Sequence, residues 1–130
     1  MTERIKSVRD LLVYKKAFDA AMRIFDISNT FPNEEKYSLT DQIRRSSRSV
    51  CTNMAEAWRK RRYKAVFVNK LSDSGQEAAE TQTWLEFALA CHYIDPPVYQ
   101  NLHEEYEQIF AMLHAMDQKA STFCNSNLRR

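Results

Sequence analysis

Apolar side chains recur at alternating three- and four-residue spacings in four long segments of the chain. This spacing returns to one face of an α-helix, because each residue turns the helix by about 100°. The four segments span approximately residues 10–29, 39–59, 64–91 and 95–123. The links between them are short, and short links join helices that run antiparallel. The pattern therefore predicts an all-α protein, an antiparallel up-down-up-down four-helix bundle.

Each segment has a main apolar face, which predicts the residues of the core. In the first segment this face consists of Leu11, Tyr14, Phe18, Ala21 and Phe25. In the second segment it consists of Leu39, Ile43, Ser46, Val50, Met54 and Ala57. The third has Phe67, Leu71, Ser74, Ala78, Thr81, Leu85 and Ala88, and the fourth has Leu102, Tyr106, Ile109, Leu113, Met116, Ala120 and Phe123. Ser38 or Thr40 is the expected N-cap of the second helix.

The first segment carries a second apolar stripe, about a third of a turn away from the first. It consists of Val13, Ala17, Ala20, Ile24 and Ile27. In the third segment, Phe87 projects away from the core face. An interface between subunits explains both features, and its residues would include Val13, Ile24, Ile27 and Phe87. The other interpretation is a broad core stripe together with one partly exposed ring.

The length of 130 residues suits one domain over residues 1–130, with frayed ends at about 1–8 and 125–130. One glycine and three prolines leave few positions for tight turns, which also favours helices. The three cysteines form no CxxC pair, and the N-terminus has no apolar signal segment. No apolar stretch approaches the roughly 18 residues of a membrane span. We therefore expect a reduced, cytoplasmic protein with no membrane partner.

Charge is strongly segregated along the chain, although the net charge is only +2. Residues 44–70 hold nine Lys or Arg and one Glu, a net charge of +8. Residues 71–118 hold no Lys or Arg and nine Asp or Glu. Such segregation is evidence about binding partners, including other copies of the same chain, and carries no information about the fold.

The basic residues of the second segment lie on the side of the helix opposite its apolar face. Outward-pointing arginines on the helix are followed by a basic link, and together they comprise Arg44, Arg45, Arg48, Arg59, Lys60, Arg61, Arg62 and Lys64. Phosphate backbones bind such a strip because each Lys or Arg replaces a condensed counterion. This predicts a surface that binds RNA or DNA. Trp58 and Tyr63 could stack on unpaired bases, although packing inside the protein is the simpler interpretation of both.

The third segment offers a second interpretation of the basic strip. Asp73, Glu77 and Glu80 form an acidic stripe beside its core face. They could pair with arginines of the second segment, either in the same chain or in a neighbouring one. A ring of subunits could use such complementary faces to select its register. A basic face that meets only solvent is the third interpretation, and the first two are compatible with each other.

No motif in the sequence points to catalysis. Di-iron bundles need Glu-x-x-His pairs, which do not occur, and a glycine-rich phosphate loop is impossible with Gly75 alone. Cys51 lies near arginines, which would favour a thiolate, but a small residue in a helix seam is the simpler interpretation. We expect no enzyme activity, no metal site and no cofactor.

Several stretches closely resemble a known family. The longest match comprises Phe31-Pro32, Glu35, Tyr37 to Thr40, Gln42 to Ser47, Ser49-Val50 and Asn53 to Glu56. Further matches are Asp10-Leu11, Tyr14 and Ala17 in the first segment, and Glu80 to Gln82, Trp84-Leu85 and Tyr93-Ile94 in and after the third. These residues resemble the four-helix bundle family of proteins encoded within 23S rRNA intervening sequences. The resemblance covers nearly the whole chain.

The resemblance implies a four-helix bundle that often assembles as a ring-shaped pentamer and has no established catalytic activity. Related accessory proteins of diversity-generating retroelements look similar in fold, form pentamers with a basic surface, and bind nucleic acid and a reverse transcriptase. By that similarity we expect a homo-oligomer that binds RNA or an RNA–protein complex, with a reverse transcriptase or a ribosomal component as the candidate protein partner. The alternative is an assembly or adaptor protein whose basic and acidic faces pair subunits without nucleic acid.

Overall fold

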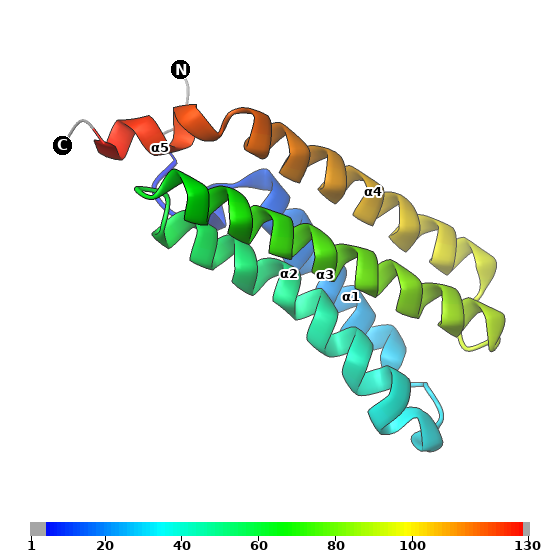
Figure 1. The fold of residues 1–130 in the computed structure, drawn as a ribbon. Coiled ribbons are helices and arrows are strands. Elements are labelled where there is room, and N and C mark those ends of the chain that lie inside the picture. The colour runs from blue at the N-terminus through cyan, green and yellow to red at the C-terminus, as the bar shows by residue number, and fades with distance from the viewer. Residues whose placement is uncertain (1–4, 129–130) are drawn as a thin grey trace.

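The computed structural model describes residues 5–128, with side chains for residues 5–124, as a bundle of helices. Its long helices are α1 (Leu12–Ser28), α2 (Asp41–Arg59), α3 (Lys64–Ala90) and α4 (Pro96–Gln118), followed by the short α5 (Ala120–Leu128). Consecutive long helices run in opposite directions, and α1 packs against both α2 and α4 (Figure 1). The prediction of an all-α helical bundle is confirmed. Within the described range, no helix combines the length and the apolar run needed to cross a membrane.

The predicted core faces of the second, third and fourth helices are confirmed. All their predicted residues are buried except Phe123, the last of the fourth face, which is half-buried against the core. Small side chains bring α2 and α3 into the most extensive helix contact of the bundle. At this seam Ser46 Oγ lies 2.8 Å from Thr81 Oγ1. Such hydrogen bonds satisfy the polar groups that the close approach buries.

The predicted core face of the first helix is wrong in part, since Leu11 and Ala21 are buried but Tyr14 and Phe25 are only half-buried. α1 buries Val13 and Ile24 of the second stripe, whereas Phe18 of the main predicted face is 52% exposed. The physical reason is that the small side chains of the second stripe, Ala17 and Ala20, let the backbone of α1 come close to α2 and α4. Val13 and Ile24 are thus core residues of their own chain and have no surface to offer to another subunit. Ile27 is half-buried against the same core.

The second helix begins differently from the prediction. The chain already forms a 3-10 turn at Asn33–Glu35 and a π-helical turn at Lys36–Thr40, and α2 continues directly from these turns. Neither predicted cap acts as one. Thr40 has helical backbone angles, and the Ser38 hydroxyl donates to Glu35 at 2.7 Å. An N-cap residue has non-helical backbone angles, so a helix that continues directly from another helical turn has no N-cap.

The fourth predicted helix is interrupted. α4 ends at Gln118, Lys119 departs from helical angles, and α5 packs against α3. The ring of Phe123 in α5 lies 6.2 Å from the ring of Trp58 and 6.0 Å from that of Phe67, measured between centroids. The interruption therefore lets the end of the chain cover the core beside the link between α2 and α3.

Parts of the two ends that are expected to fray have secondary structure where they are described. Ser7 caps a short turn at Val8–Asp10, and Val8 is buried. Residues 125–128 belong to α5. Residues 1–4 and 129–130, which complete the predicted frayed ends, lie outside the described residues.

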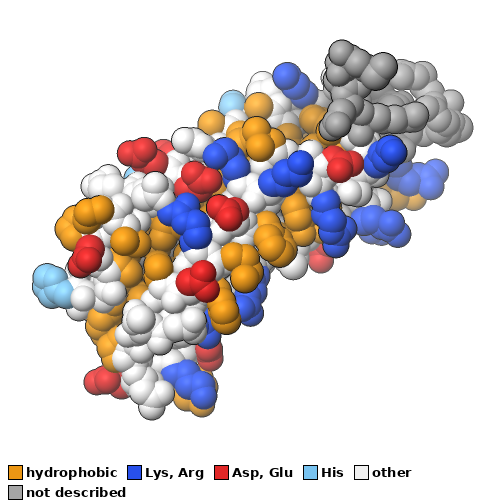
Figure 2. Space-filling view, turned by 180° about the vertical axis from the view of Figure 1, so that it is seen from behind, with side chains coloured by type: hydrophobic (Ala, Val, Ile, Leu, Met, Phe, Trp, Pro, Cys, Tyr) orange, Lys and Arg blue, Asp and Glu red, His pale blue; other side chains and the backbone are white. Residues whose placement is uncertain are grey.

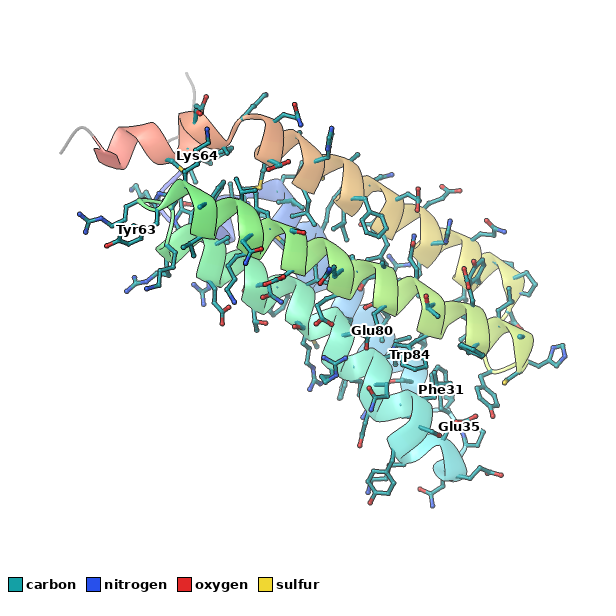
Figure 3. The ribbon with its side chains drawn as sticks, in the orientation of Figure 1. Phe31, Glu35, Tyr63, Lys64, Glu80 and Trp84 are labelled. Atoms are coloured by element: carbon teal, nitrogen blue, oxygen red, sulfur yellow. The ribbon has the colours of Figure 1, made fainter. Side chains whose placement is uncertain are left out.

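At the opposite end of the bundle, one hydrogen bond joins the α1–α2 connection to the α3–α4 connection. The hydroxyl of Tyr93 donates to the Glu35 carboxylate at 2.8 Å, and the Tyr93 ring lies 5.6 Å from that of Phe31. Figure 3 labels Phe31 and Glu35 at this end. Hydrogen bonds from Ser38 and then from Tyr93 lower the pKa of Glu35. The bond to Glu35 in turn raises the pKa of Tyr93 to about 12.

The variant Tyr93→Phe is expected to melt at a lower temperature than the wild type at neutral pH. A carboxyl group with a lowered folded pKa contributes stability that is present above its unfolded pKa and is lost as pH falls through the folded value. The deficit of the variant should therefore shrink in acid, as the pH falls through the lowered pKa of Glu35 and its carboxylate takes up a proton. Thermal melts at neutral pH and at low pH measure this, with Tyr37→Phe as an exposed control. An equal deficit at both pH values would contradict it.

Candidate nucleic-acid interface

Basic side chains surround the link between α2 and α3. Arg59 ends α2, Lys60 and Arg62 stand in the link, and Lys64 begins α3; all four are exposed. We call these four residues, together with half-buried Arg61, the basic turn. It contains five of the eight residues that the sequence predicts for nucleic-acid binding, and the structure brings them together at one end of the bundle.

Backbone hydrogen bonds fix the shape of this link. The Lys60 N–H donates to the Glu56 carbonyl at 3.0 Å and closes α2, while the Tyr63 N–H donates to the Lys60 carbonyl at 2.9 Å. Tyr63 has extended backbone angles, and α3 then begins without a side-chain hydrogen bond at its N-cap. The uncapped amides of the first turn of α3 add a partial positive charge beside the cations.

The exposed cations of the basic turn have no acidic partner among the described residues. The ion pairs found within residues 5–124 engage Lys16, Arg45, Lys70 and His103 instead. Lys64 donates to the neutral hydroxyl of Ser121 in α5 at 2.7 Å. Figure 2 shows Lys and Arg side chains gathered at the end of the molecule that also carries the chain termini. Cations without nearby acids concentrate positive potential, so this end of the molecule favours an anion.

Arg61 and Trp58 face the protein. The Arg61 guanidinium lies 4.1 Å from the centroid of the Trp58 ring and donates to the Trp58 carbonyl at 2.8 Å. Trp58 is only 8% exposed and packs against Phe123. Packing is therefore the correct interpretation of Trp58. Arg61 helps to hold Trp58 in place, so it has a structural role besides its charge.

Arg44 does not point freely outward as the helical wheel predicts. Its Nε donates to the Ser28 hydroxyl at 2.8 Å, and its Nη2 donates to the Asn29 side chain at 2.9 Å. The guanidinium also lies 4.7 Å from the centroid of the Phe25 ring. A cation at the C-terminus of a helix is stabilised by the helix dipole. Arg44 therefore joins α2 to the end of α1 and is less available to a ligand than the basic turn.

Arg45 pairs with the predicted acidic stripe inside the same chain. It binds the carboxylates of Glu77, at 3.5 Å, and of Glu80. Glu80 also accepts a hydrogen bond from the Trp84 indole at 3.2 Å, and Figure 3 labels these two residues on α3. Asp73, the third member of the stripe, lies 4.0 Å from Lys70. The sequence leaves open whether this stripe pairs with arginines of the same chain or of a neighbouring chain. The structure contains the pairing within the same chain.

Arg48 is the exposed arginine of the α2 face without a carboxylate partner among the described residues. Its guanidinium lies 5.8 Å from the Phe25 ring centroid. It lines a shallow depression of about 490 Å³, whose other lining residues are Asp41, Arg44, Arg45, Ser49 and Thr52. The predicted basic strip is therefore divided: Arg44 and Arg45 bind their own chain, while Arg48 and the exposed residues of the basic turn remain available.

Tyr63 differs from the simpler sequence interpretation, which places its ring inside the protein. Its side chain is 54% exposed, and the Arg62 guanidinium lies 5.5 Å from the ring centroid. Figure 3 shows Tyr63 and Lys64 at the end of the molecule where α2 passes into α3. The relevant signal in the sequence is local, because Tyr63 stands in a polar link between Arg62 and Lys64, outside every apolar stripe.

A second exposed surface is apolar and lies on α1. Phe18 is 52% and Met22 47% exposed, and Tyr14 beside them is half-buried. These three residues, which we call the α1 apolar surface, line a shallow hollow of about 640 Å³ with Arg9, Lys15 and Asp19. Phe87 on α3 is 54% exposed beside Trp84, with ring centroids 6.1 Å apart. Aromatic surface therefore remains uncovered on both α1 and α3 of the described chain.

The three cysteines of the chain are free, and two of them are buried. Burial raises the pKa of the Cys51 thiol to about 12, which opposes formation of the thiolate. Cys124 is also buried, and Cys91 is exposed and unpaired. Across the described residues, no three His, Cys, Asp or Glu side chains come together as a metal site.

Comparison with known proteins places the chain in a family. The family model of the 23S rRNA-intervening sequence protein matches residues 9–115. A crystal structure from Bacteroides thetaiotaomicron, of a protein with unknown function from the S23 ribosomal protein family, is 31% identical, with a TM-score of 0.74 over 82% of this chain and 98% of that one. No protein with a curated description matches. The chain belongs to the 23S rRNA-intervening sequence protein family.

Proposed function

We propose that this protein is a non-enzymatic helical bundle that binds nucleic acid through the basic turn, assisted by Arg48. The observation that supports this most directly is the group of exposed cations Arg59, Lys60, Arg62 and Lys64, which have no acidic partner in the described part of the chain. Arg45, in contrast, is neutralised by Glu77 and Glu80. RNA is the preferred ligand because of the family to which the chain belongs.

The binding energy in this proposal comes mainly from counterion release. Each Lys or Arg that meets a phosphate frees a condensed counterion, and the affinity then falls as salt is added. Arg59 and Arg62 can also hold a phosphate with two parallel hydrogen bonds. A site of this kind selects phosphate chains over neutral ligands without reading their sequence.

The triple variant Arg59→Ala, Lys60→Ala, Arg62→Ala is expected to bind RNA at least about tenfold more weakly at low salt. Removing three phosphate contacts should reduce the slope of log affinity against log salt by about 2 for a single strand. Fluorescence anisotropy with a labelled oligonucleotide, at salt concentrations from about 50 to 200 mM, measures both quantities.

Matched single variants make this test specific. Lys60→Ala and Lys36→Ala each remove one exposed cation, but Lys36 lies in the connection between α1 and α2, at the other end of the bundle. Only Lys60→Ala should reduce the affinity and the salt slope. Equal effects of both, or an unchanged affinity of the triple variant, would remove the basis for this proposal.

A second function, homo-oligomer assembly, is favoured by the α1 apolar surface. Exposed aromatic and methionine side chains that lie together are typical of protein interfaces. The charge-pairing form of this hypothesis is weakened, because Glu77 and Glu80 already bind Arg45 in their own chain. We propose that subunits meet through apolar contacts, in a cytoplasmic assembly whose further partner is a reverse transcriptase or a ribosomal component.

A further inference from the structure

We propose that Tyr63 is a stacking platform for an unpaired base, so that the ligand of the basic turn is single-stranded nucleic acid. This inference rests on the proposed nucleic-acid function and specifies its ligand. A base that stacks on the Tyr63 ring would leave its flanking phosphates next to the cations of the basic turn. Stacking of this kind tolerates any base, because every base has a π-face.

The first argument is the contrast between the two aromatic residues near the link. Trp58 is covered on several sides by Arg61, Phe123 and the core, and is 8% exposed. Tyr63 contributes little to the core, since 54% of its side chain meets solvent. What distinguishes Tyr63 from other exposed rings, such as Tyr37, is its place within the most basic stretch of the chain.

The second argument is that the position of Tyr63 is fixed before any ligand arrives. Its N–H donates to the Lys60 carbonyl at 2.9 Å, and its carbonyl accepts from the Phe67 N–H at 2.9 Å in the first turn of α3. Phe67 itself is fully buried. Because the backbone is anchored, little conformational entropy is lost when a base stacks on the ring.

The third argument is the chemistry around the ring. The Arg62 guanidinium, 5.5 Å from the ring centroid, combines a cation with a flat surface suited to base and phosphate. Beyond Lys64, a shallow hollow of about 700 Å³ runs over the first turns of α3, lined by Lys64, Ala65, Val68, Asn69 and Ser72. Its amide and hydroxyl groups offer hydrogen bonds to a neighbouring nucleotide. A single strand can therefore continue from Tyr63 across this hollow.

A duplex does not match this arrangement. Its bases are already stacked on one another and present only their edges in the grooves, so the face of Tyr63 has nothing to stack upon. The cations would still attract its phosphates. The arrangement therefore favours single strands over duplexes beyond the general attraction to phosphate.

The test compares Tyr63→Ala and Tyr63→Phe with the wild type, using unstructured single-stranded RNA, single-stranded DNA of the same sequence, and the corresponding duplex. Tyr63→Ala should weaken single-strand binding by about 5- to 150-fold, the range found for loss of one stacked base. Tyr63→Phe keeps the π-face and should retain most of the affinity. Duplex binding should change little, and the RNA and DNA arms identify which strand the site prefers.

Tyr37→Ala is the matched control. Tyr37 is also exposed, at 73%, beside a cation, since Lys36 Nζ lies 5.4 Å from its ring centroid, but at the other end of the bundle. It should bind like the wild type. If Tyr63→Ala binds single strands normally while the triple variant of the basic turn does not, the stacking inference is overturned and the proposed function stands. If the wild type binds none of the three probes, both are overturned.

Discussion

The substitution Ile24→Ala is expected to lower the free energy of unfolding by about 2–5 kcal/mol, whereas Phe18→Ala should change it by only about 0.5 kcal/mol. Both residues lie on α1 and both are apolar. Ile24 is fully buried, so its truncation leaves a cavity between α1 and its neighbours, while Phe18 is 52% exposed. The larger side chain thus has the smaller effect, the reverse of what the sequence pattern predicts.

Urea denaturation followed by circular dichroism measures this difference. Each variant should be studied at two protein concentrations, because assembly through the α1 apolar surface would make apparent stability depend on concentration. A loss for Phe18→Ala that disappears on dilution belongs to assembly, and one that persists belongs to the fold. If Phe18→Ala costs as much as Ile24→Ala under dilute conditions, the assignment of faces on α1 is wrong.

The α1 error shows where the apolar pattern of a sequence is insufficient. α1 has two stripes of equal periodicity, and the stripe with Tyr14, Phe18 and Phe25 contains the larger residues. Residue size favours that stripe when the helix is considered alone. In the bundle α1 lies against both α2 and α4, so the stripe with Ala17 and Ala20 allows the closer approach. The choice depends on which stripe the neighbouring helices cover, which the sequence of one helix does not contain.

The other helices each have one apolar stripe, and their core residues could be predicted from spacing alone. Their ends could not. The segment before α2 forms a π-helical turn, whose geometry departs from the 3.6-residue repeat on which the prediction depends. The break at Lys119 is marked by neither glycine nor proline, so the stripe from Met116 to Phe123 continues through it unchanged.

The location of the candidate site was predictable because segregation of charge is visible in the sequence. The availability of each side chain was not. Arg44, Arg45 and Arg48 look equivalent on a helical wheel, yet Arg44 binds the end of α1 and Arg45 binds α3. Only the tertiary packing decides which cation is already neutralised. The exposed residues of the basic turn have no acidic partner in the described part of the chain, and their role in binding stays a prediction.

The variant Phe18→Glu is expected to convert a homo-oligomer into smaller species, ultimately the single chain. Phe18 lies one turn of α1 from Tyr14 and one from Met22, with ring centroids of Tyr14 and Phe18 6.1 Å apart. A carboxylate placed there would lose its hydration whenever a second subunit covered the α1 apolar surface, and an unpaired buried charge costs several kcal/mol. Because Phe18 is exposed in the single chain, the fold should survive. Size-exclusion chromatography with light scattering measures the mass of the assembly.

Phe87→Glu is the matched control, since Phe87 is as exposed as Phe18 but has only Trp84 as an aromatic neighbour on α3. It should leave the mass unchanged. Dissociation by Phe87→Glu alone would show that the interface lies on α3, and a monomeric wild type would contradict the proposal of assembly.

One further measurement tests nucleic-acid binding and assembly together. An oligomer presents several basic turns to one strand, so Phe18→Glu should weaken binding to a long RNA far more than to a short one, through loss of multivalency.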